Sequence, residues 1–140
     1  MRITKTSFYA LSFTWGIIMT LIGLVAALFL VVTGHKPMKH GLCYRFEVGQ
    51  GWGGVNLGPV IITAANPSER TKNHEHGHAL QNCIWGPLMP FVIALPSATR
   101  YWIREVQSKQ GKKLEPYDNA WFEGDATRRG TEFMNSLGGE

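Results

Sequence analysis

The stretch that decides the fold is His74-Glu75-His76-Gly77-His78, which reads as HExxH. We predict a helix that begins near Thr71 to Asn73, continues through this motif to about Ile84, and is stopped by Gly86-Pro87. At about 100° per residue, His74 and His78 differ by roughly 40° around the helix axis, so both imidazoles can reach one ion. A hydrolytic zinc centre uses this arrangement.

The residues between the two histidines have different predicted roles. Glu75 is turned aside by about one residue step, where a carboxylate can act as a general base on an activated water. His76 lies about 200° from His74, so we exclude it as a ligand of the same metal and expect it at the surface or behind a ligand. Gly77 lets another backbone approach the helix closely.

A catalytic zinc site needs a third protein ligand beside an open position for water. No histidine follows His78, so the third ligand must be a carboxylate, a cysteine or an upstream histidine. The segment WFEGDA offers Glu123 and Asp125. Glu123 stands between bulky aromatic residues and a glycine, which favours an inward orientation. We therefore predict Glu123 as the third ligand, and Asp125 either as a residue that orients a ligand or as a solvated charge.

Size and composition limit the chain to one small domain on an apolar segment. Of the 140 residues, roughly one hundred remain for a single core after the apolar start. The net charge is +4, but basic residues are scattered, so we expect a membrane surface rather than nucleic acid as the partner. Cys43 and Cys83 form no CxxC pair; we favour two free thiols, and a bridge between them stays open.

The N-terminal part carries no charged residue from Thr6 to Gly34. About twenty apolar residues suffice for a helix to cross the hydrocarbon layer, so residues 1–35 are predicted as an N-terminal segment with a transmembrane helix. A cleaved signal peptide is the alternative, because the start of the chain is basic. We expect a single-pass membrane protein with a cytoplasmic C-terminal domain, and the oligomeric state stays open.

The rest of the chain is predicted to form an α+β domain over residues 36–130, with a β-hairpin and about three helices. The hairpin joins strands at 43–48 and 55–63, the second interrupted by Gly58-Pro59. Further helices are predicted from Ser97 to about Gln110 and from about Asn119 to Arg129, where Gly130 ends the last one. Residues 131–140 are predicted as a flexible tail.

The motif residues resemble a known class of enzymes. HEHGH, followed by a later helix with glutamate in WFEGDA, is similar to the gluzincin zinc metallopeptidases. This resemblance implies a zincin-like fold in which His74, His78 and Glu123 bind Zn²⁺ and Glu75 is the base. More closely, the segments around HEHGH, GP, PS and WFE resemble small, uncharacterised bacterial membrane proteins, which brings no established function.

Together these patterns predict a membrane-anchored, zinc metallopeptidase-like hydrolase whose partners are membrane lipid and a peptide or protein substrate. By analogy with zincins, the strand within 55–63 would pair with an extended substrate, and Arg100, Tyr101 or Arg104 would stabilise the oxyanion. The alternative is a non-catalytic membrane binding or scaffold protein in which zinc only staples a small domain.

Overall fold

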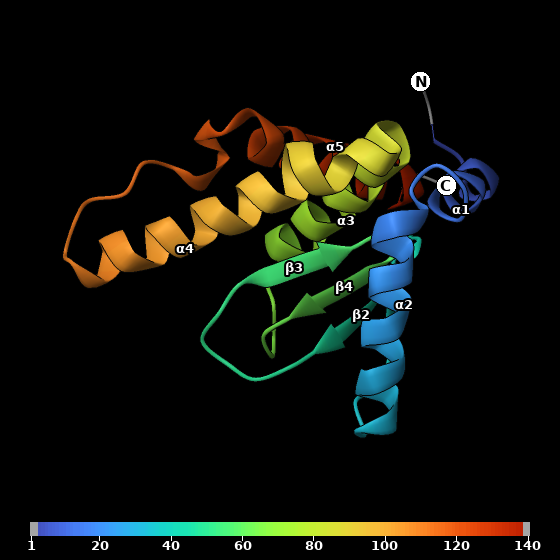
Figure 1. Ribbon diagram of the computed structural model, residues 1–140, viewed down its shortest axis with the longest axis horizontal. Helices are drawn as coiled ribbons and strands as arrows, with labels where there is room; N and C mark the ends of the chain where they lie inside the picture. The colour runs from blue at the N-terminus through green and yellow to red at the C-terminus, as the bar shows by residue number, and fades with distance from the viewer. Residues whose placement is uncertain (1–2, 139–140) are drawn as a thin grey trace.

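The computed structural model describes residues 3–138, and residues 1–2 and 139–140 lie outside the description. Within that range the chain has an α+β fold, as predicted, with a four-stranded mixed sheet and five α-helices (Figure 1). The helices are α1 (Lys5–Ser12), α2 (Ile17–Val32), α3 (Glu69–Trp85), α4 (Leu95–Lys109) and α5 (Trp121–Gly138). The strands are β1 (Met38–His40), β2 (Cys43–Glu47), β3 (Gly54–Leu57) and β4 (Val60–Thr63).

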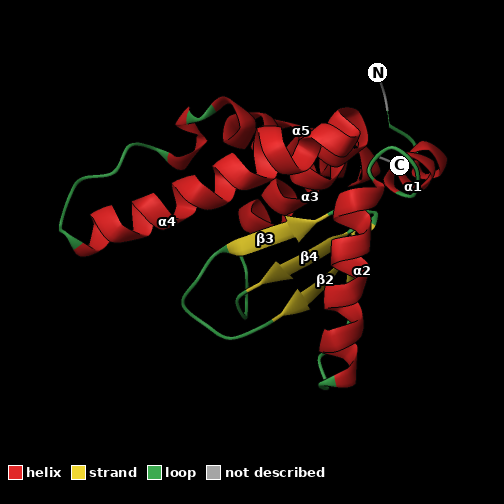
Figure 2. Cartoon of the chain, in the orientation of Figure 1, coloured by secondary structure: helices red, strands yellow, loops and turns green. Residues whose placement is uncertain are grey.

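The sheet has the order β1-β2-β4-β3, with β2 and β4 parallel and the other neighbours antiparallel. Figure 2 shows β2, β4 and β3 side by side, with the arrows of β2 and β4 pointing the same way. The predicted hairpin between 43–48 and 55–63 is therefore wrong. Gly58 and Pro59 form a turn, so the segment 55–63 folds back on itself as β3 and β4. Gly58 has a φ of +65°, which glycine adopts readily, and the Asn56 side chain donates to its carbonyl at 2.8 Å. As a result β3 is an edge strand and β4 is an inner one.

Helices cover both faces of this sheet. Successive residues of a strand point to opposite faces, so Val60 and Ile61 of β4 show what lies on each side. Ile61 packs in one cluster with Ala79 and Leu80 of α3, whereas Val60 packs in another with Leu30 of α2. The motif helix α3 and the apolar helix α2 therefore lie on opposite faces of the sheet.

The apolar N-terminal part forms two helices rather than the single long helix that we predicted. α1 and α2 meet at a 90° bend. Side chains satisfy the carbonyls near this break, because Thr20 donates to Ser12 O at 2.6 Å and Asn82 of α3 donates to Gly16 O at 3.2 Å. Across residues 3–138, no single helix combines the length and apolar character needed to cross a membrane. Two pairs of helices have the required length and apolar character when each pair is taken together, but both pairs are bent. These pairs are α1 with α2, and Glu69–Leu88 with Pro90–Lys109.

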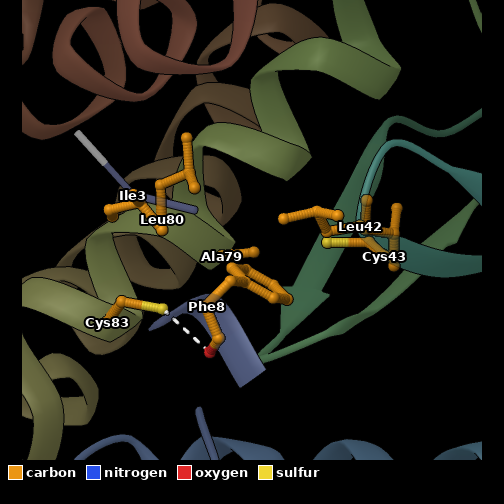
Figure 3. Close-up of a cluster of buried hydrophobic side chains, with 8 residues drawn as sticks. Ile3, Phe8, Leu42, Cys43, Ala79, Leu80 and Cys83 are labelled. Atoms are coloured by element: carbon orange, nitrogen blue, oxygen red, sulfur yellow. Dashed lines mark hydrogen bonds between the residues drawn. The ribbon is translucent and has the colours of Figure 1, made fainter. Parts of the chain in front are cut away.

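Helix α1 belongs to the core of the domain. Phe8 is fully buried against Ala79, Leu80 and Cys83 of α3 (Figure 3). Phe8 lies between Cys83 and Cys43 in this view, and both cysteines are free and buried, as we favoured. Helix α1 is thus packed into the same core as the motif helix.

Three helix boundaries differ from those predicted. Ser68 caps α3, its side chain accepting from the Thr71 N–H, so that helix begins slightly before the predicted range. The apolar segment after α3 is helical throughout, with a 3₁₀ turn at Gly86–Leu88 and a π turn at Pro90–Ala94 leading into α4. Gly130 does not end the last helix. α5 continues to Gly138, so most of the predicted flexible tail is helical.

Gly130 does not end helix α5 because it lies where α5 crosses α3. A Cβ on Gly130 would lie 1.7 Å from the Asn73 carbonyl oxygen of α3, and a Cβ on Gly77 would lie 1.7 Å from the Ala126 carbonyl oxygen of α5. Helix α3 and helix α5 therefore touch through their backbones at two points, and no side chain fits between them. Gly77 has the role that the sequence predicted for it.

The crossing gives a direct prediction for Gly130→Ala. Alanine favours a helix by about 1 kcal/mol, but the overlap of its methyl group with Asn73 O outweighs this. We expect the free energy of unfolding to fall by about 2 kcal/mol in urea denaturation. Ser136→Ala, at an exposed position of the same helix, is the control and should stay within about 0.5 kcal/mol of the wild type. A Gly130→Ala protein as stable as the wild type would contradict the crossing.

Candidate metal centre

The helix crossing brings His74, His78 and Glu123 together. The Glu123 Oε2 atom lies 2.8 Å from His74 Nε2 and 3.7 Å from His78 Nε2, and the three donor atoms all lie within 4.8 Å of one another. All three side chains are buried. The residues come from one face of α3 and from the first turns of α5, so the predicted ligands form one group that can hold a metal ion.

The outer nitrogen of each histidine ring has an oxygen partner that fixes the tautomer. His78 Nδ1 lies 2.7 Å from Gln81 Oε1, and because an amide oxygen only accepts, Nδ1 carries the proton. His74 Nδ1 lies 2.7 Å from Thr127 Oγ1. That hydroxyl donates to Asp118 Oδ1 at 3.1 Å, so it accepts from His74. Both Nε2 atoms of the neutral rings therefore present lone pairs toward Glu123.

This arrangement leaves acceptor atoms facing each other. A lone pair on His74 Nε2 and a carboxylate oxygen of Glu123 repel at 2.8 Å unless a proton or a metal ion lies with them. A tetrahedral zinc ion with bonds of about 2.0–2.1 Å would place its ligand atoms about 3.3 Å apart, between the two distances from Glu123. Two imidazoles and a carboxylate suit zinc, and they also suit iron and other divalent metals. The donor set fits a metal ion and does not identify it.

Glu123 is held from a third helix as well. Ser97 of α4 donates its hydroxyl to Glu123 Oε1 at 2.5 Å, which leaves Oε2 for the histidines. Burial alone would raise the pKa of Glu123, but hydrogen bonds from His74 and His78, which need a proton on each Nε2 atom when no metal ion is bound, outweigh burial and lower that pKa well below its usual range. The carboxylate is therefore ionised at neutral pH, as a metal ligand must be.

Among the described residues, Asp125 forms no hydrogen bond with a ligand and is connected to His78 through Gln81. Gln81 Nε2 donates to Asp125 Oδ2 at 2.9 Å and to the Phe122 carbonyl at 2.9 Å, while Gln81 Oε1 accepts from His78. Arg129 also donates to Asp125 Oδ2, at 2.8 Å. Asp125 thus fixes the amide of Gln81, and Gln81 in turn orients His78.

A cleft of about 250 Å³ opens beside this group. Glu75 lines it and is buried, and burial raises the pKa of its carboxyl group even though His78 and His74 act in the opposite direction. The edge strand contributes Gly54, where a Cβ would lie only 3.4 Å from Glu75 Oε1. The other residues around the cleft are Gly53, Arg70, Thr71, His74, Tyr101, Tyr117 and Asp118.

His76 lies away from the metal group, in the hydrophobic core. Its Nε2 atom accepts from the Leu42 N–H at 3.1 Å, and its ring stacks on Phe133 with the centroids 4.9 Å apart. Burial lowers its pKa to about 4. The exclusion of His76 as a ligand agrees with this position, but the surface position that we allowed for it is wrong. Helix α1, which contributes Phe8 to the stack, covers this face.

Sequence reasoning missed most of the residues that support the ligands. Of the proposed oxyanion groups, only Tyr101 lines the cleft, whereas Arg100 and Arg104 donate to backbone carbonyls of the linker after α4. Ser97 was predicted only as the start of a helix, which begins instead at Leu95, and Thr127 received no role. Thr127 had a usable signal, since it lies one helical turn after Glu123 and so on the same face of the last helix. Ser97 had none, because only the tertiary fold brings α4 against α5.

No known protein family, curated protein or solved structure matches this chain. The resemblance to gluzincins therefore stays a prediction that rests on His74, Glu75, His78 and Glu123.

The hydrogen bond between Thr127 and His74 gives a prediction for zinc affinity. Thr127→Val keeps the shape of the side chain but removes the acceptor that holds the His74 ring with Nε2 toward the site. We expect zinc to bind about tenfold more weakly, measured by competition with a chelator, while the circular dichroism spectrum is unchanged. Thr131→Val, one turn further along α5, is the control. Equal affinity in the two variants would show that Thr127 does not orient the ligand.

Proposed function

We propose that this protein is a zinc-dependent hydrolase of peptide bonds that is held at a membrane. One observation carries this proposal: His74, His78 and Glu123 form a buried group of three donors, and one of them, His74, lines a cleft together with Glu75. Structural zinc sites use four protein ligands and are closed, whereas catalytic sites use three and keep one position open. The three donors found among the described residues match the number of ligands in a catalytic site, which supports the proposal.

Zinc held by His74, His78 and Glu123 would supply a Lewis acid that polarises a water molecule and a substrate carbonyl. The protein's own contribution to proton transfer is Glu75. Its side chain follows His74 directly on α3 and lines the cleft, and burial raises the pKa of its carboxyl group above the usual value, which makes the carboxylate a better proton acceptor. Glu75 can therefore take a proton in the cleft and deliver it to the leaving amine.

The edge strand supports a peptide as the substrate class. Since β3 pairs with β4 on one side only, its other edge can hydrogen-bond to an extended chain. Its first residue, Gly54, and the preceding Gly53 line the cleft beside Glu75. Two glycines at this place leave room for a substrate backbone to approach the general base.

Exposed apolar side chains on α2 support attachment to a membrane. Such a continuous apolar surface is rare on proteins surrounded only by water. A helix of 16 residues is about 24 Å long, which is shorter than the hydrocarbon layer of about 30 Å. We therefore propose that α2 inserts into the bilayer without crossing it by itself. The large exposed apolar residues of α2 are Ile18, Leu21, Ile22, Leu24, Val25, Leu28, Phe29, Val31 and Val32.

The alternative is a scaffold in which the metal only staples the domain. The position of the site favours this reading in one respect, because the donors join α3 to α5, the same pair of helices that touch through Gly77 and Gly130. A metal ion there would hold the two helices together whether or not any reaction took place.

Glu75→Gln separates the two functions. In the hydrolase, this change removes the base and should lower the hydrolysis of a fluorogenic peptide library by at least about 100-fold, with zinc stoichiometry and thermal midpoint preserved. Glu123→Gln is the matched comparison, since it changes the same group on a ligand and should lower zinc content itself. Zinc-loaded wild-type protein without peptidase activity, or a Glu75→Gln protein with full activity, would favour the scaffold.

A further inference from the structure

A second cavity, of about 390 Å³, lies between helix α4 and the linker that follows it. Its lining is strongly basic, with Arg100 and Arg104 from the helix and Lys112 and Lys113 from the linker, against a single acidic residue, Glu115. The other lining residues, Ile103, Gln107 and Leu114, carry no charge. The excess of positive charge around one cavity favours the binding of an anion.

The two arginines are fixed in place without a carboxylate partner. Arg100 Nη1 donates to the Tyr117 carbonyl at 2.6 Å, and Arg104 Nη1 donates to the Glu115 carbonyl at 2.7 Å. Both guanidinium groups lie 5.0 Å from the centroid of the Tyr117 ring. Backbone carbonyls and an aromatic face orient these side chains but do not neutralise them.

Among the residues that the structure describes, none of the four cations forms an ion pair with an acidic side chain. Like charges one helical turn apart repel, so Arg100 and Arg104 are held close at some cost in free energy. An anion bound between them would remove that repulsion. The cavity thus has the features of a prepared anion site.

We propose that this cavity binds a phosphate group, presented either as free phosphate or as the headgroup of an anionic phospholipid. A phosphate monoester carries about −1.5 to −2 charges and three acceptor oxygens, which matches several cations around one cavity better than a single carboxylate does. Guanidinium groups bind phosphate through paired N–H donors, and most donors of Arg100 and Arg104 remain available.

The site is separate from the metal centre. Tyr117 lines the metal cleft, while Arg100 and Arg104 stack on its ring and line the basic cavity. The proposal rests on these cations alone and does not depend on a metal ion or on hydrolysis, so a failure of the proposed function would leave it in place.

Titration calorimetry of the full chain in a non-ionic detergent tests the proposal. The probes are inorganic phosphate and dioctanoyl phosphatidate, with dioctanoyl glycerol as the ligand that lacks phosphate. We expect saturable binding of at least one phosphate probe. The variant Lys112→Gln/Lys113→Gln leaves the anchored arginines in place and should bind about tenfold more weakly. Binding of both probes would show that free phosphate suffices, and binding of phosphatidate alone would identify the lipid as the source.

One double variant serves as the control. Lys36→Gln/Lys39→Gln removes the same number of exposed charges outside the cavity and should bind as the wild type does. The proposal is wrong if neither phosphate probe binds, if dioctanoyl glycerol binds as well as phosphatidate, or if both lysine variants lose affinity equally.

Discussion

The backbone contact between α3 and α5 is the constraint on which the site depends. Packed helices usually keep their axes about 8–10 Å apart because side chains lie between them. At Gly77 and Gly130 no side chain lies between, and a carbonyl of the facing helix occupies the place where a Cβ would be. This approach sets how far Glu123 reaches toward His74 and His78. The motif glycine is thus a packing residue, and its counterpart on α5 looks like a helix end in the sequence.

Around this contact, the ligands are oriented by residues from three helices. Gln81 of α3 and Thr127 of α5 hold the outer nitrogens of the two histidines, and Ser97 of α4 holds the second oxygen of Glu123. Each of these bonds directs a lone pair toward the same point. Because acceptor atoms that converge in a buried place require a cation, the polar network itself argues for a metal ion or bound protons.

The sequence predicted the parts of this site that follow from local geometry. Helical periodicity was sufficient to pair His74 with His78 and to separate His76, and the surroundings of Glu123 suggested its inward direction. Prediction from the sequence failed where a segment that is distant along the chain determines the local structure. The burial of His76 depends on α1, the bend before α2 depends on Asn82 of α3, and the helical character of the chain after Gly130 depends on the crossing. Hydrophobicity alone identified the N-terminal segment as apolar but could not show that Phe8 belongs to the core.

The most direct test of the account is an anomalous-scattering map at the zinc edge from crystals of zinc-loaded protein. We expect one buried peak within about 2.0–2.2 Å of His74 Nε2, His78 Nε2 and a Glu123 oxygen, with Glu75 outside bonding distance and the remaining position facing the cleft. No peak at this place, or a peak whose ligands do not include Glu123, would contradict it.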